Sequence, residues 1–388
     1  MMLSLAIVSL VISCLPAIMF AKNLPAFLFP VLPGKQNAGL ADSGDSQTDN
    51  IGLTGVSVLI PARDEEAGIA KSVNAALLSQ GVDVEVLVLD DHSTDRTAQI
   101  VQELAEADSR VRYLMGAGLP EGWNGKQFGC KQLSEAARYS MLVFIDADVR
   151  LKADALQRLV TCYDSIGVGL LSAFPHQETE TILEKWIIPL MHYVLLGFCP
   201  LHRMRTNCSP ALAAGCGQLF MTKQDAYRKA GTHAAICGSR HDGVKLPRAY
   251  REAGLMTDVY DGQELADCRM YHSAKEVVRG VLKNATEGLA GPKLIFPFTI
   301  LLIGGSVLPA VLLVLSLVLG DMAAAIVAGV ALLVGHFPRG LAATRLSQSW
   351  LGVFFHAPAM LLFVILQWVA FLSQLAGRQV AWRGRTSS

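Results

Sequence analysis

Two aspartates one residue apart, Asp146 and Asp148, follow the apolar stretch Met141 to Ile145. This stretch has the β-branched and aromatic residues of a buried strand. Because side chains at positions i and i+2 of an extended chain point the same way, the two carboxylates can face one site. Such a pair can hold a divalent cation that also binds the phosphates of a nucleotide diphosphate. A plain strand that ends in a polar turn is the alternative, since aspartate is common in turns.

Two further acidic clusters each follow an apolar stretch. The first comprises Pro61 to Glu66, and the second comprises Asp90 to Thr97. Ligands bind beyond the carboxyl ends of parallel strands. We therefore expect both clusters to meet Asp146 and Asp148 in one crevice.

Individual residues of these clusters have a binding role and a structural alternative. Asp91 can accept a hydrogen bond from a ribose or a base, Arg63 can reach a phosphate, and Pro61 fixes a tight exit from its strand. Helix capping is the better explanation for Ser93 and Asp95, but it does not explain the acidic residues that precede them.

The clusters must be positioned by regular elements, and strands and helices alternate from Gly55 onward. The expected strands are 56–60, 84–89, 111–115 and 141–145, and the expected helices are 67–78, 97–107 and 125–138. Such an alternation favours a parallel sheet with helices on its faces, an α/β class. The preceding stretch 34–53 is rich in Gly, Ser, Asp, Gln and Asn, which is typical of a flexible linker.

Composition limits the class of protein. The 388 residues have a formal net charge of zero, which gives no overall attraction for nucleic acid. The eight cysteines form neither a Cys-x-x-Cys pair nor a His/Cys cluster with zinc spacing. We therefore expect no disulfide framework and no structural zinc, as in a reducing compartment.

The N-terminal end is a candidate membrane anchor. Leu3 to Ala21 is apolar over about the 20 residues that a spanning helix needs. A cleaved signal peptide is the alternative. No positive charge precedes the stretch, whereas Lys22 and Lys35 follow it, so we favour an uncleaved anchor whose carboxyl side lies in the cytoplasm.

The C-terminal end holds two or three further candidates. Ile295 to Leu319 would rise about 37 Å as a helix, enough to cross a bilayer. Met322 to Phe337 is marginal in length, but the short Gly320-Asp321 junction indicates a return pass. Trp350 to Leu375 either spans the membrane or is re-entrant. A full crossing would place three arginines outside, against the positive-inside tendency: Arg378, Arg383 and Arg385.

The ordered set of Pro61 to Glu66, Asp90 to Thr97 and Asp146-Ala147-Asp148 resembles the family 2 glycosyltransferases, which have the GT-A fold. Gly122-Trp123-Asn124-Gly125-Lys126 resembles the Gly-Trp-x-Gly-Lys segment of the hopanoid-biosynthesis-associated and carotenoid-type membrane members. The likeness covers most of the chain. It implies a Rossmann-like, mostly parallel sheet with helices on both faces, and transmembrane helices at both ends.

The resemblance also implies a donor site for a nucleotide-diphosphate sugar, with a UDP-sugar as the first expectation. Asp146 and Asp148 would hold Mg²⁺ or Mn²⁺ as the D-x-D motif. Lys126 can neutralise phosphate charge, and the glycines beside it let the backbone approach a ligand closely. The donor-binding residues implied in this way are Pro61, Ala62, Arg63, Glu65, Asp91, Lys126 and Asp146.

An inverting transfer requires a base, because the acceptor hydroxyl loses its proton as it attacks the anomeric carbon. Relatives carry an acidic pair in the segment Ser239 to Arg248, and Asp242 matches its first position while Gly243 replaces the second. The resemblance therefore implies Asp242 as the base, with helix capping as its alternative. His241 has three interpretations, a base, a metal ligand or a hydrogen-bonded structural histidine, and we favour the last.

Acceptor binding is expected near the membrane. Thr181 to Leu201 is apolar but interrupted, so an interfacial helix and a buried core helix are equal alternatives. Ala213 to Met221 resembles the family's strand beside the acceptor pocket. On the expected helix Ala274 to Leu289, Arg279 and Lys283 share a face and can bind pyrophosphate or anionic headgroups.

These observations predict a membrane-bound, metal-dependent inverting glycosyltransferase with a lipid acceptor of isoprenoid or hopanoid type. We expect a multi-pass protein of the cytoplasmic membrane whose catalytic domain faces the cytoplasm. The Gln-x-x-Arg-Trp motif of processive polysaccharide synthases is absent from the region before the C-terminal helices, which favours single transfer. The alternatives are a polyprenyl-phosphate sugar synthase and an inactive membrane scaffold that binds sugar nucleotides. The expected parts are an anchor at 1–22, the linker at 34–53, the catalytic domain at 54–290 and a C-terminal membrane region at 295–377.

Overall fold

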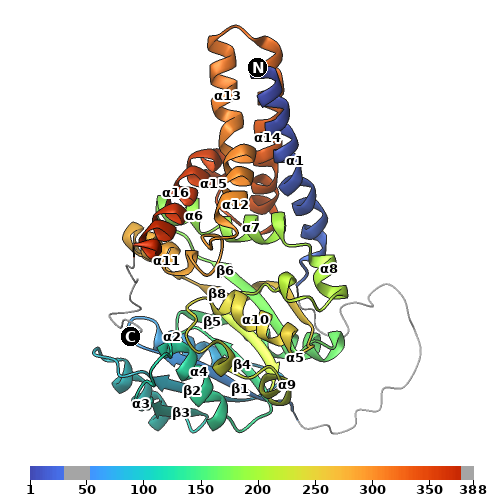
Figure 1. Cartoon of the computed structure of the whole chain (residues 1–388). Coiled ribbons are helices and arrows are strands. Elements are labelled where there is room, and N and C mark those ends of the chain that lie inside the picture. Colours follow the sequence, from blue (N-terminus) through green and yellow to red (C-terminus); the bar gives the residue numbers. More distant parts are fainter. Residues whose placement is uncertain (30–52, 377–388) are drawn as a thin grey trace, which may run out of the picture. The chain divides into compact units, whose positions relative to one another are not determined.

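The computed structural model describes residues 1–29 and 53–376, and Figure 1 shows their elements. Contacts divide these residues into two compact units. The helical unit comprises residues 1–26, 177–203 and 270–376, and the α/β unit comprises residues 27–29, 53–176 and 204–269. The expected linker, except for Leu53, and the three arginines at 378, 383 and 385 lie outside the described residues.

The α/β unit is built on an eight-stranded sheet with the order β3-β2-β1-β4-β7-β6-β8-β5. The pairs among β3, β2, β1 and β4 are parallel, whereas β7 is antiparallel to β4 and β6, and β5 is antiparallel to β8. The predicted α/β class is confirmed, and the first four strands of this order pair in parallel. The strands are β1 (Gly55–Ala62), β2 (Asp83–Asp90), β3 (Val111–Met115), β4 (Met141–Ile145), β5 (Val149–Leu151), β6 (Leu170–Gln177), β7 (Leu219–Lys223) and β8 (Thr257–Cys268).

The register of the parallel strands explains where the acidic clusters lie. Ala62 at the end of β1 pairs with Asp90 at the end of β2, and Leu59 pairs with Phe144 near the end of β4. The three strands therefore finish at one edge of the sheet, as parallel pairing requires. The helices of this unit are α2 (Ile69–Leu77), α3 (Thr97–Ala107), α4 (Gly125–Ala136), α5 (Ala155–Ile166), α9 (Gln224–Lys229) and α10 (Asp242–Glu252), with short 3₁₀ turns η2 (Pro210–Leu212) and η3 (His233–Ile236).

Apolar strand residues form the core of the α/β unit. The side chains of Leu59, Leu87 and Leu142 are fully buried and belong to one cluster with Phe144 and Phe220. Burying such side chains is the main favourable contribution to folding, about 1.5 to 3 kcal/mol each. This packing holds the strand ends rigidly under the loops that carry the polar residues.

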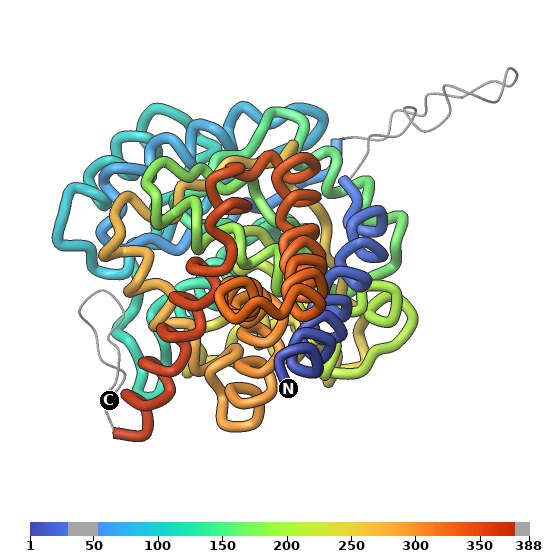
Figure 2. Tube along the Cα trace, turned by 90° about the horizontal axis from the view of Figure 1, so that it is seen from above, coloured from blue at the N-terminus to red at the C-terminus, as the bar shows by residue number. Residues whose placement is uncertain are grey.

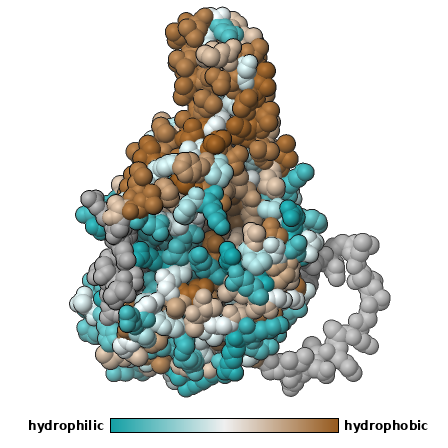
Figure 3. Space-filling view, viewed as in Figure 1, coloured by the Kyte–Doolittle hydropathy of each residue, from teal (hydrophilic) through white to brown (hydrophobic). Residues whose placement is uncertain are grey.

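The helical unit contains four segments that are long and apolar enough to cross a membrane: Met2–Ala26, Ile295–Val318, Met322–Arg345 and His356–Leu375. Figure 3 shows hydrophobic side chains covering the visible face of these helices. Such an exposed apolar surface is expected of helices that face lipid. The helices and turns are α1 (Met2–Asn23), η1 (Leu24–Ala26), α6 (Ile182–Ile187), α7 (Leu190–Phe198), α11 (Ala274–Ala285), α12 (Ile295–Leu302), the π-helix η4 (Ile303–Val307), α13 (Leu308–Val318), α14 (Met322–Arg345), α15 (Trp350–Phe354) and α16 (His356–Leu375). The short helix α8 (Leu201–Thr206) begins in this unit, and its residues from Met204 onward belong to the α/β unit.

Two sequence expectations change here. The candidate that ended at Phe337 was judged marginal in length, but α14 continues through Pro338 to Arg345. The stretch 350–375 is broken at Phe355, and α16 alone has 20 residues, enough for about 30 Å of rise.

Between Thr181 and Leu201 the chain forms separate short helices on either side of Pro189. Most residues of α7 are buried, so the buried-helix alternative holds for α7.

The first helix of this unit, α1, packs against α14 and against the π-helix η4. Figure 2 shows α1 beside α14, and the two helices contact each other along their length. The π-helix η4 leaves backbone carbonyls of Gly304 and Gly305 outside the regular pattern, and they accept hydrogen bonds from Ser9 Oγ at 2.6 Å and Ser13 Oγ at 2.8 Å of α1. Hydroxyl groups in an apolar bundle satisfy freed backbone groups in this way.

Candidate active site

The centre of the site is a partly buried ion-pair cluster in the α/β unit. The ammonium Nζ of Lys126 lies 2.5 Å from Asp146 Oδ1 and 2.8 Å from Asp242 Oδ2, and it donates to the carbonyl of Gly217 at 3.3 Å. Sequence analysis assigned these three charged residues to donor binding, metal binding and proton transfer. The structure brings all three side chains to one point.

The start of α4 places Lys126. Gly122 has a positive φ of 78°, which a glycine adopts without strain, and it turns the chain ahead of the helix. Asn124 then caps α4, because its side chain accepts a hydrogen bond from the backbone N–H of Lys126 at 3.1 Å. Gly122 and Asn124 of the Gly-Trp-x-Gly-Lys segment thus have local structural roles that fix the position of the lysine.

Asp242 is the first residue of α10, and His241 is the cap residue. Capping by the Asp242 side chain is therefore not its role, and its carboxylate pairs with Lys126 instead. Gly217 lies so close that a Cβ at this position would overlap the Asp242 carboxyl group. The glycine in the loop before β7 is required by this approach.

The charges in the cluster stabilise one another. Burial by itself would raise the pKa of Asp242, but the ammonium of Lys126 holds that pKa well below the usual range of a carboxyl group. Burial lowers the pKa of Lys126, and Asp146 and Asp242 overcome this effect and raise it well above its usual value. Lys126 and Asp242 are therefore both charged at neutral pH.

Asp148 has a different environment from Asp146. Its Oδ1 atom is buried and has no hydrogen-bond partner, although oxygen atoms in such positions are normally satisfied. Burial and the neighbouring Asp146 raise the pKa of Asp148 to about 6. An orphaned carboxylate oxygen beside a second carboxylate fits the first two ligands of a hard divalent cation such as Mg²⁺ or Mn²⁺. Within residues 1–29 and 53–376, no group of three His, Cys, Asp or Glu side chains forms a metal site, so further ligands would come from phosphate oxygens or water.

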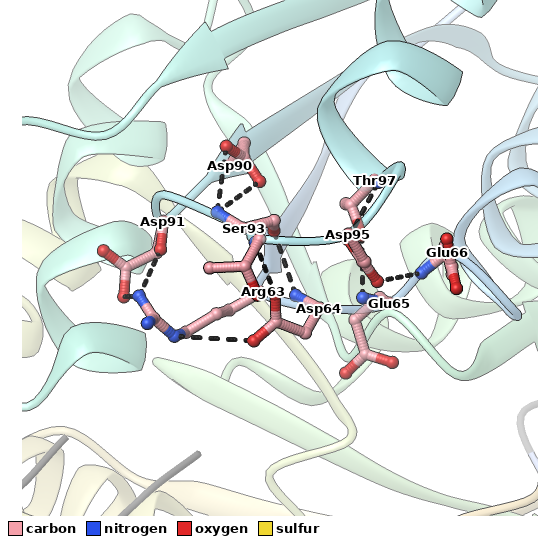
Figure 4. A network of polar contacts seen from close by, with 10 residues as sticks. Arg63, Asp64, Glu65, Glu66, Asp90, Asp91, Ser93, Asp95 and Thr97 are labelled. Carbon is pink, nitrogen blue, oxygen red and sulfur yellow. Dashed lines mark hydrogen bonds and ion pairs between the residues drawn. The ribbon is translucent and has the colours of Figure 1, made fainter. Parts of the chain in front are cut away.

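The loops after β1 and β2 are tied together by hydrogen bonds, as Figure 4 shows. The backbone N–H of Asp64 donates to Ser93 Oγ at 2.9 Å, that of Glu65 donates to Thr97 Oγ1 at 2.8 Å, and that of Glu66 donates to an Asp95 carboxylate oxygen at 3.0 Å. Ser93 and Thr97 thus join two loops. Neither Ser93 nor Asp95 is the cap residue of α3, which is Arg96; the Asp95 carboxylate instead accepts from the backbone N–H of Thr97, the first residue of the helix, at 2.9 Å.

The side chain of Arg63 contacts Asp91 in this structure. Its Nη1 atom donates to the backbone carbonyl of Asp91 at 2.6 Å and lies 3.6 Å from an oxygen of the Asp91 carboxylate. The side chains of Arg63 and Asp91 are both about nine-tenths buried. The predicted phosphate contact of Arg63 remains a prediction, whereas the pairing fixes the Asp91 carboxylate at the end of β2.

A narrow hollow at the end of β4 is lined by the ion-pair cluster and by a histidine that the sequence did not single out. His233 is buried, its Nδ1 lies 2.7 Å from the hydroxyl of Tyr227, and its ring lies 4.9 Å from that of Phe144. Burial lowers the pKa of His233 to about 3, so its ring is neutral. The lining residues are Pro61, Lys126, Cys130, Phe144, Ile145, Asp146, Gly217, Phe220, His233 and Asp242.

Some predicted site residues belong to the other unit. Arg279 and Lys283 lie on α11 of the helical unit, four residues apart on one helix, so their proposed contact with pyrophosphate remains a prediction. Lys283 is half-buried and Arg279 is exposed. His241 lies beside Asp242 at the start of α10 and is not among the lining residues of the hollow.

Comparison with known proteins finds a family match for the segment that holds most of this site. Residues 57–230, which include most of β1, all of β4 and the Lys126 loop, match the family model of glycosyl transferase family 2. The matched residues are fewer than half of the 388 in the chain. The predicted resemblance is confirmed over this segment, and apolar helices lie near the N-terminus and in the C-terminal region.

Curated relatives agree with this assignment. The chain is 30% identical over 257 residues to a 4,4'-diaponeurosporenoate glycosyltransferase of Staphylococcus aureus strain USA300, and equally so over 264 residues to the protein of the same name from strain MRSA252. The match covers 64% of this chain and spans 65% of the length of these relatives.

Among solved structures, a mannosyltransferase from Pyrobaculum calidifontis, in complex with GDP-Man and Mn²⁺, shares the fold. It has a TM-score of 0.56 and 16% identity, and the alignment covers 96% of this chain and 99% of the other. At this identity the likeness concerns the fold alone, and it confirms the predicted GT-A class.

Proposed function

We propose that this chain is a membrane-anchored inverting glycosyltransferase that moves one sugar from a nucleoside diphosphate sugar to a lipid acceptor. The observation that carries the proposal is the Lys126, Asp146 and Asp242 cluster, beside the orphaned oxygen of Asp148, in a family 2 domain. A lipid acceptor is supported by the four apolar helices and by the name of the Staphylococcus aureus relatives, whose substrate is a carotenoid-type acid.

The donor would bind at the edge where β1, β2 and β4 end. Asp91, held by Arg63, presents a carboxylate to the ribose or base, and Lys126 presents an ammonium to the diphosphate. Asp146 and Asp148 would hold Mg²⁺ or Mn²⁺, which stabilises the negative charge that grows on a leaving diphosphate. Pro61, Ala62 and Glu65 complete the proposed donor site.

Asp242 would accept the proton of the acceptor hydroxyl. As the acceptor oxygen bonds to the anomeric carbon, the bond from that carbon to the nucleoside diphosphate breaks, and the proton moves to a carboxylate oxygen of Asp242. The ammonium of Lys126 keeps the pKa of Asp242 low despite burial of the carboxyl group. A diphosphate that engages the Lys126 ammonium would therefore make Asp242 more basic when the donor is bound.

Turnover by the purified full-length chain tests the proposal. The protein in detergent is incubated with labelled UDP- and GDP-sugars, extracted membrane lipids and Mg²⁺ or Mn²⁺, and label in the lipid phase is measured. We expect transfer that EDTA abolishes. Comparing UDP-sugars with GDP-sugars tests the predicted preference for a UDP-sugar. Comparing lipid fractions tests the predicted isoprenoid or hopanoid acceptor.

Asp148→Ala is the first diagnostic variant. Loss of its carboxylate should reduce transfer by about 10² to 10³-fold, because electrostatic groups at a leaving phosphate contribute on this scale. Asp164→Ala, which removes a carboxylate paired with Lys223 on the surface, is the matched control and should keep activity. Full activity of Asp148→Ala would contradict the metal role.

Asp242→Asn separates the proposed reaction from a polyprenyl-phosphate sugar synthase. A hydroxyl acceptor needs a base, whereas a phosphate acceptor is already ionised and does not. Loss of transfer in Asp242→Asn supports the hydroxyl acceptor. Retained transfer would favour the phosphate acceptor. An absence of any transfer by the wild-type chain would favour the inactive scaffold.

A further inference from the structure

A buried arginine in the helical unit lacks an anionic partner. Arg339 of α14 is 1% exposed, and its Nε atom has no hydrogen-bond partner. Its Nη1 atom makes one long hydrogen bond of 3.5 Å to the amide oxygen of Gln348. Among the described residues, no aspartate or glutamate forms an ion pair with Arg339. A guanidinium is always charged and carries five N–H donors, so this site holds an unbalanced positive charge.

The polar groups around Arg339 are neutral amides, hydroxyls and imidazoles. Gln348 also contacts His192 Nδ1 at 3.2 Å, and Ser306 Oγ lies 3.3 Å from the Tyr193 hydroxyl and 3.2 Å from His356 Nε2. The Nδ1 atom of the fully buried His356 has no partner. These contacts supply hydrogen bonds but no negative charge, so they do not balance the guanidinium.

The backbone is shaped to seat this side chain. Gly352 of α15 lies against the guanidinium, and a Cβ at this position would overlap Arg339 Nη2 and the carbonyl of Lys185. Ser306 belongs to the π-helix η4, a form that occurs frequently at functional sites. An arginine without a function on a lipid-facing helix would require neither Gly352 nor a π-helix nearby. Their presence therefore indicates a binding site.

We infer that Arg339 binds the anionic head group, a carboxylate or a phosphate, of a ligand with an apolar chain. The planar fork of a guanidinium matches both groups bidentately, and an intramembrane charge is normally balanced by such a partner. The apolar chain follows from the position of Arg339 within a candidate membrane span, Met322–Arg345, whose outer face exposes large hydrophobic residues such as Ile326 and Leu333. Either a membrane phospholipid or a single-chain lipid acid or phosphate carries this chemistry.

The inference goes beyond the proposed transfer reaction and is tested without any sugar nucleotide. Binding to the purified full-length chain in uncharged detergent is measured with palmitate and dodecyl phosphate, and with methyl palmitate and dodecanol as neutral analogues. Nanodiscs of phosphatidylglycerol or of phosphatidylcholine form a separate arm. Binding of the single-chain anions identifies a lipid acid or phosphate as the ligand, and stabilisation by phosphatidylglycerol alone identifies a membrane headgroup.

Arg339→Met and Arg345→Met are matched variants on the same helix, because Arg345 is exposed near its end. We expect anion binding to weaken at least about tenfold in Arg339→Met and to stay unchanged in Arg345→Met. Equal binding of acids and neutral analogues by the wild-type chain, or unchanged anion binding by Arg339→Met, would overturn the inference.

A melting temperature separates this role from a structural one. If Arg339 serves to bind an anionic ligand, the ligand-free Arg339→Met variant should have a melting temperature equal to or above that of the wild-type chain, because the substitution removes an uncompensated buried charge. A structural arginine would give a lower melting temperature and leave the selectivity for anions intact. If Arg339→Met does not fold, Arg339→Lys, which keeps the charge but not the fork, should show weakened anion binding with a smaller loss.

Discussion

At the scale of single residues, Lys126 decides the charge state of the site. Two carboxylates lie within 2.8 Å of its ammonium, and a diphosphate would compete with them for it. Lys126 keeps Asp242 ionised and holds both carboxylates in place. Binding of a diphosphate to the ammonium would weaken the contact with Asp242 and make that carboxylate more basic.

Lys126→Met should weaken binding of a nucleoside diphosphate by about tenfold or more, because a charge-assisted contact contributes about 1.5 to 3 kcal/mol. It should also destabilise the α/β unit, by less than the about 3 to 5 kcal/mol of a fully buried pair, because it leaves the buried Asp242 and the partly exposed Asp146 without the ammonium. Calorimetric titration and thermal melting measure these changes. Lys131→Met on the same helix, where the lysine pairs with the exposed Glu135, is the control and should change neither.

The identities of these residues were predictable from the sequence, but their pairing was not. Asp146 and Asp148 follow a clear strand, and Lys126 lies in a recognisable glycine-rich segment. The contact between Lys126 and Asp242 depends on how α10 packs near Gly217, a long-range feature with no local sequence pattern. His233 was missed for a related reason, since a single histidine in a short 3₁₀ turn has no periodicity or motif that marks it.

At the scale of elements, the loop before β7 and the start of α10 fix Asp242 together. Gly217→Ala should push the Asp242 carboxylate from its position and lower kcat by about 10²-fold, the loss expected from a displacement near 1 Å. A steady-state assay of transfer measures it. Gly118→Ala is the matched control, because a Cβ there meets no atom within 4 Å, and it should keep wild-type activity. Equal kcat for both variants would contradict the positioning role of Gly217.

The link between the loops after β1 and β2 predicts a pH dependence of stability. Slight burial raises the pKa of Asp95, but hydrogen bonds from Thr97 and from the backbone N–H of Glu66 lower it overall. A carboxylate whose pKa is lowered by folding stabilises the fold above its unfolded pKa near 4, and this contribution disappears as the pH falls through the folded pKa.

The melting temperature of Asp95→Asn should therefore lie below that of the wild-type chain at pH 6, and the gap should shrink toward pH 3. Thermal melting across this range measures it. Glu106→Gln removes an exposed carboxylate of α3 and should show no such gap at any pH. A gap for Asp95→Asn that stays constant as the pH falls would rule out the carboxylate as its source.

Element prediction succeeded where the pattern was local. The strands 111–115 and 141–145 and the helix 97–107 match their predicted bounds, and β1 and β2 differ by only a residue or two at each end. The antiparallel half of the sheet was not predicted beyond the β7 segment. β6 is buried along most of its length, so its sequence lacks the alternation that marks a half-exposed antiparallel strand.

At the scale of the whole molecule, each unit is discontinuous in sequence. The first helix joins residues 177–203 and the C-terminal helices, although a long stretch of the chain separates them. Asn23 at the end of α1 illustrates the link, because its side-chain amide donates to the carbonyls of Leu196 at 2.8 Å and Cys199 at 2.7 Å. Hydropathy identifies the spanning helices, but it carries no information on such contacts, so the burial of α7 could not be decided from the sequence.

The number and order of the candidate spans predict the membrane topology. With the carboxyl side of α1 in the cytoplasm, the second span runs outward, and Gly320, at a positive φ of 72°, and the capping residue Asp321 form the outer turn before α14 returns. Arg345 then lies on the cytoplasmic side, as the positive-inside tendency requires. Alkaline phosphatase, which is active only outside, should be active when fused after Gly320 and inactive when fused after Ser347. A green fluorescent protein fused at the same two positions should give the opposite pattern. The reverse result for both reporters would contradict this topology, because the residues that follow α1 would then lie outside the cell.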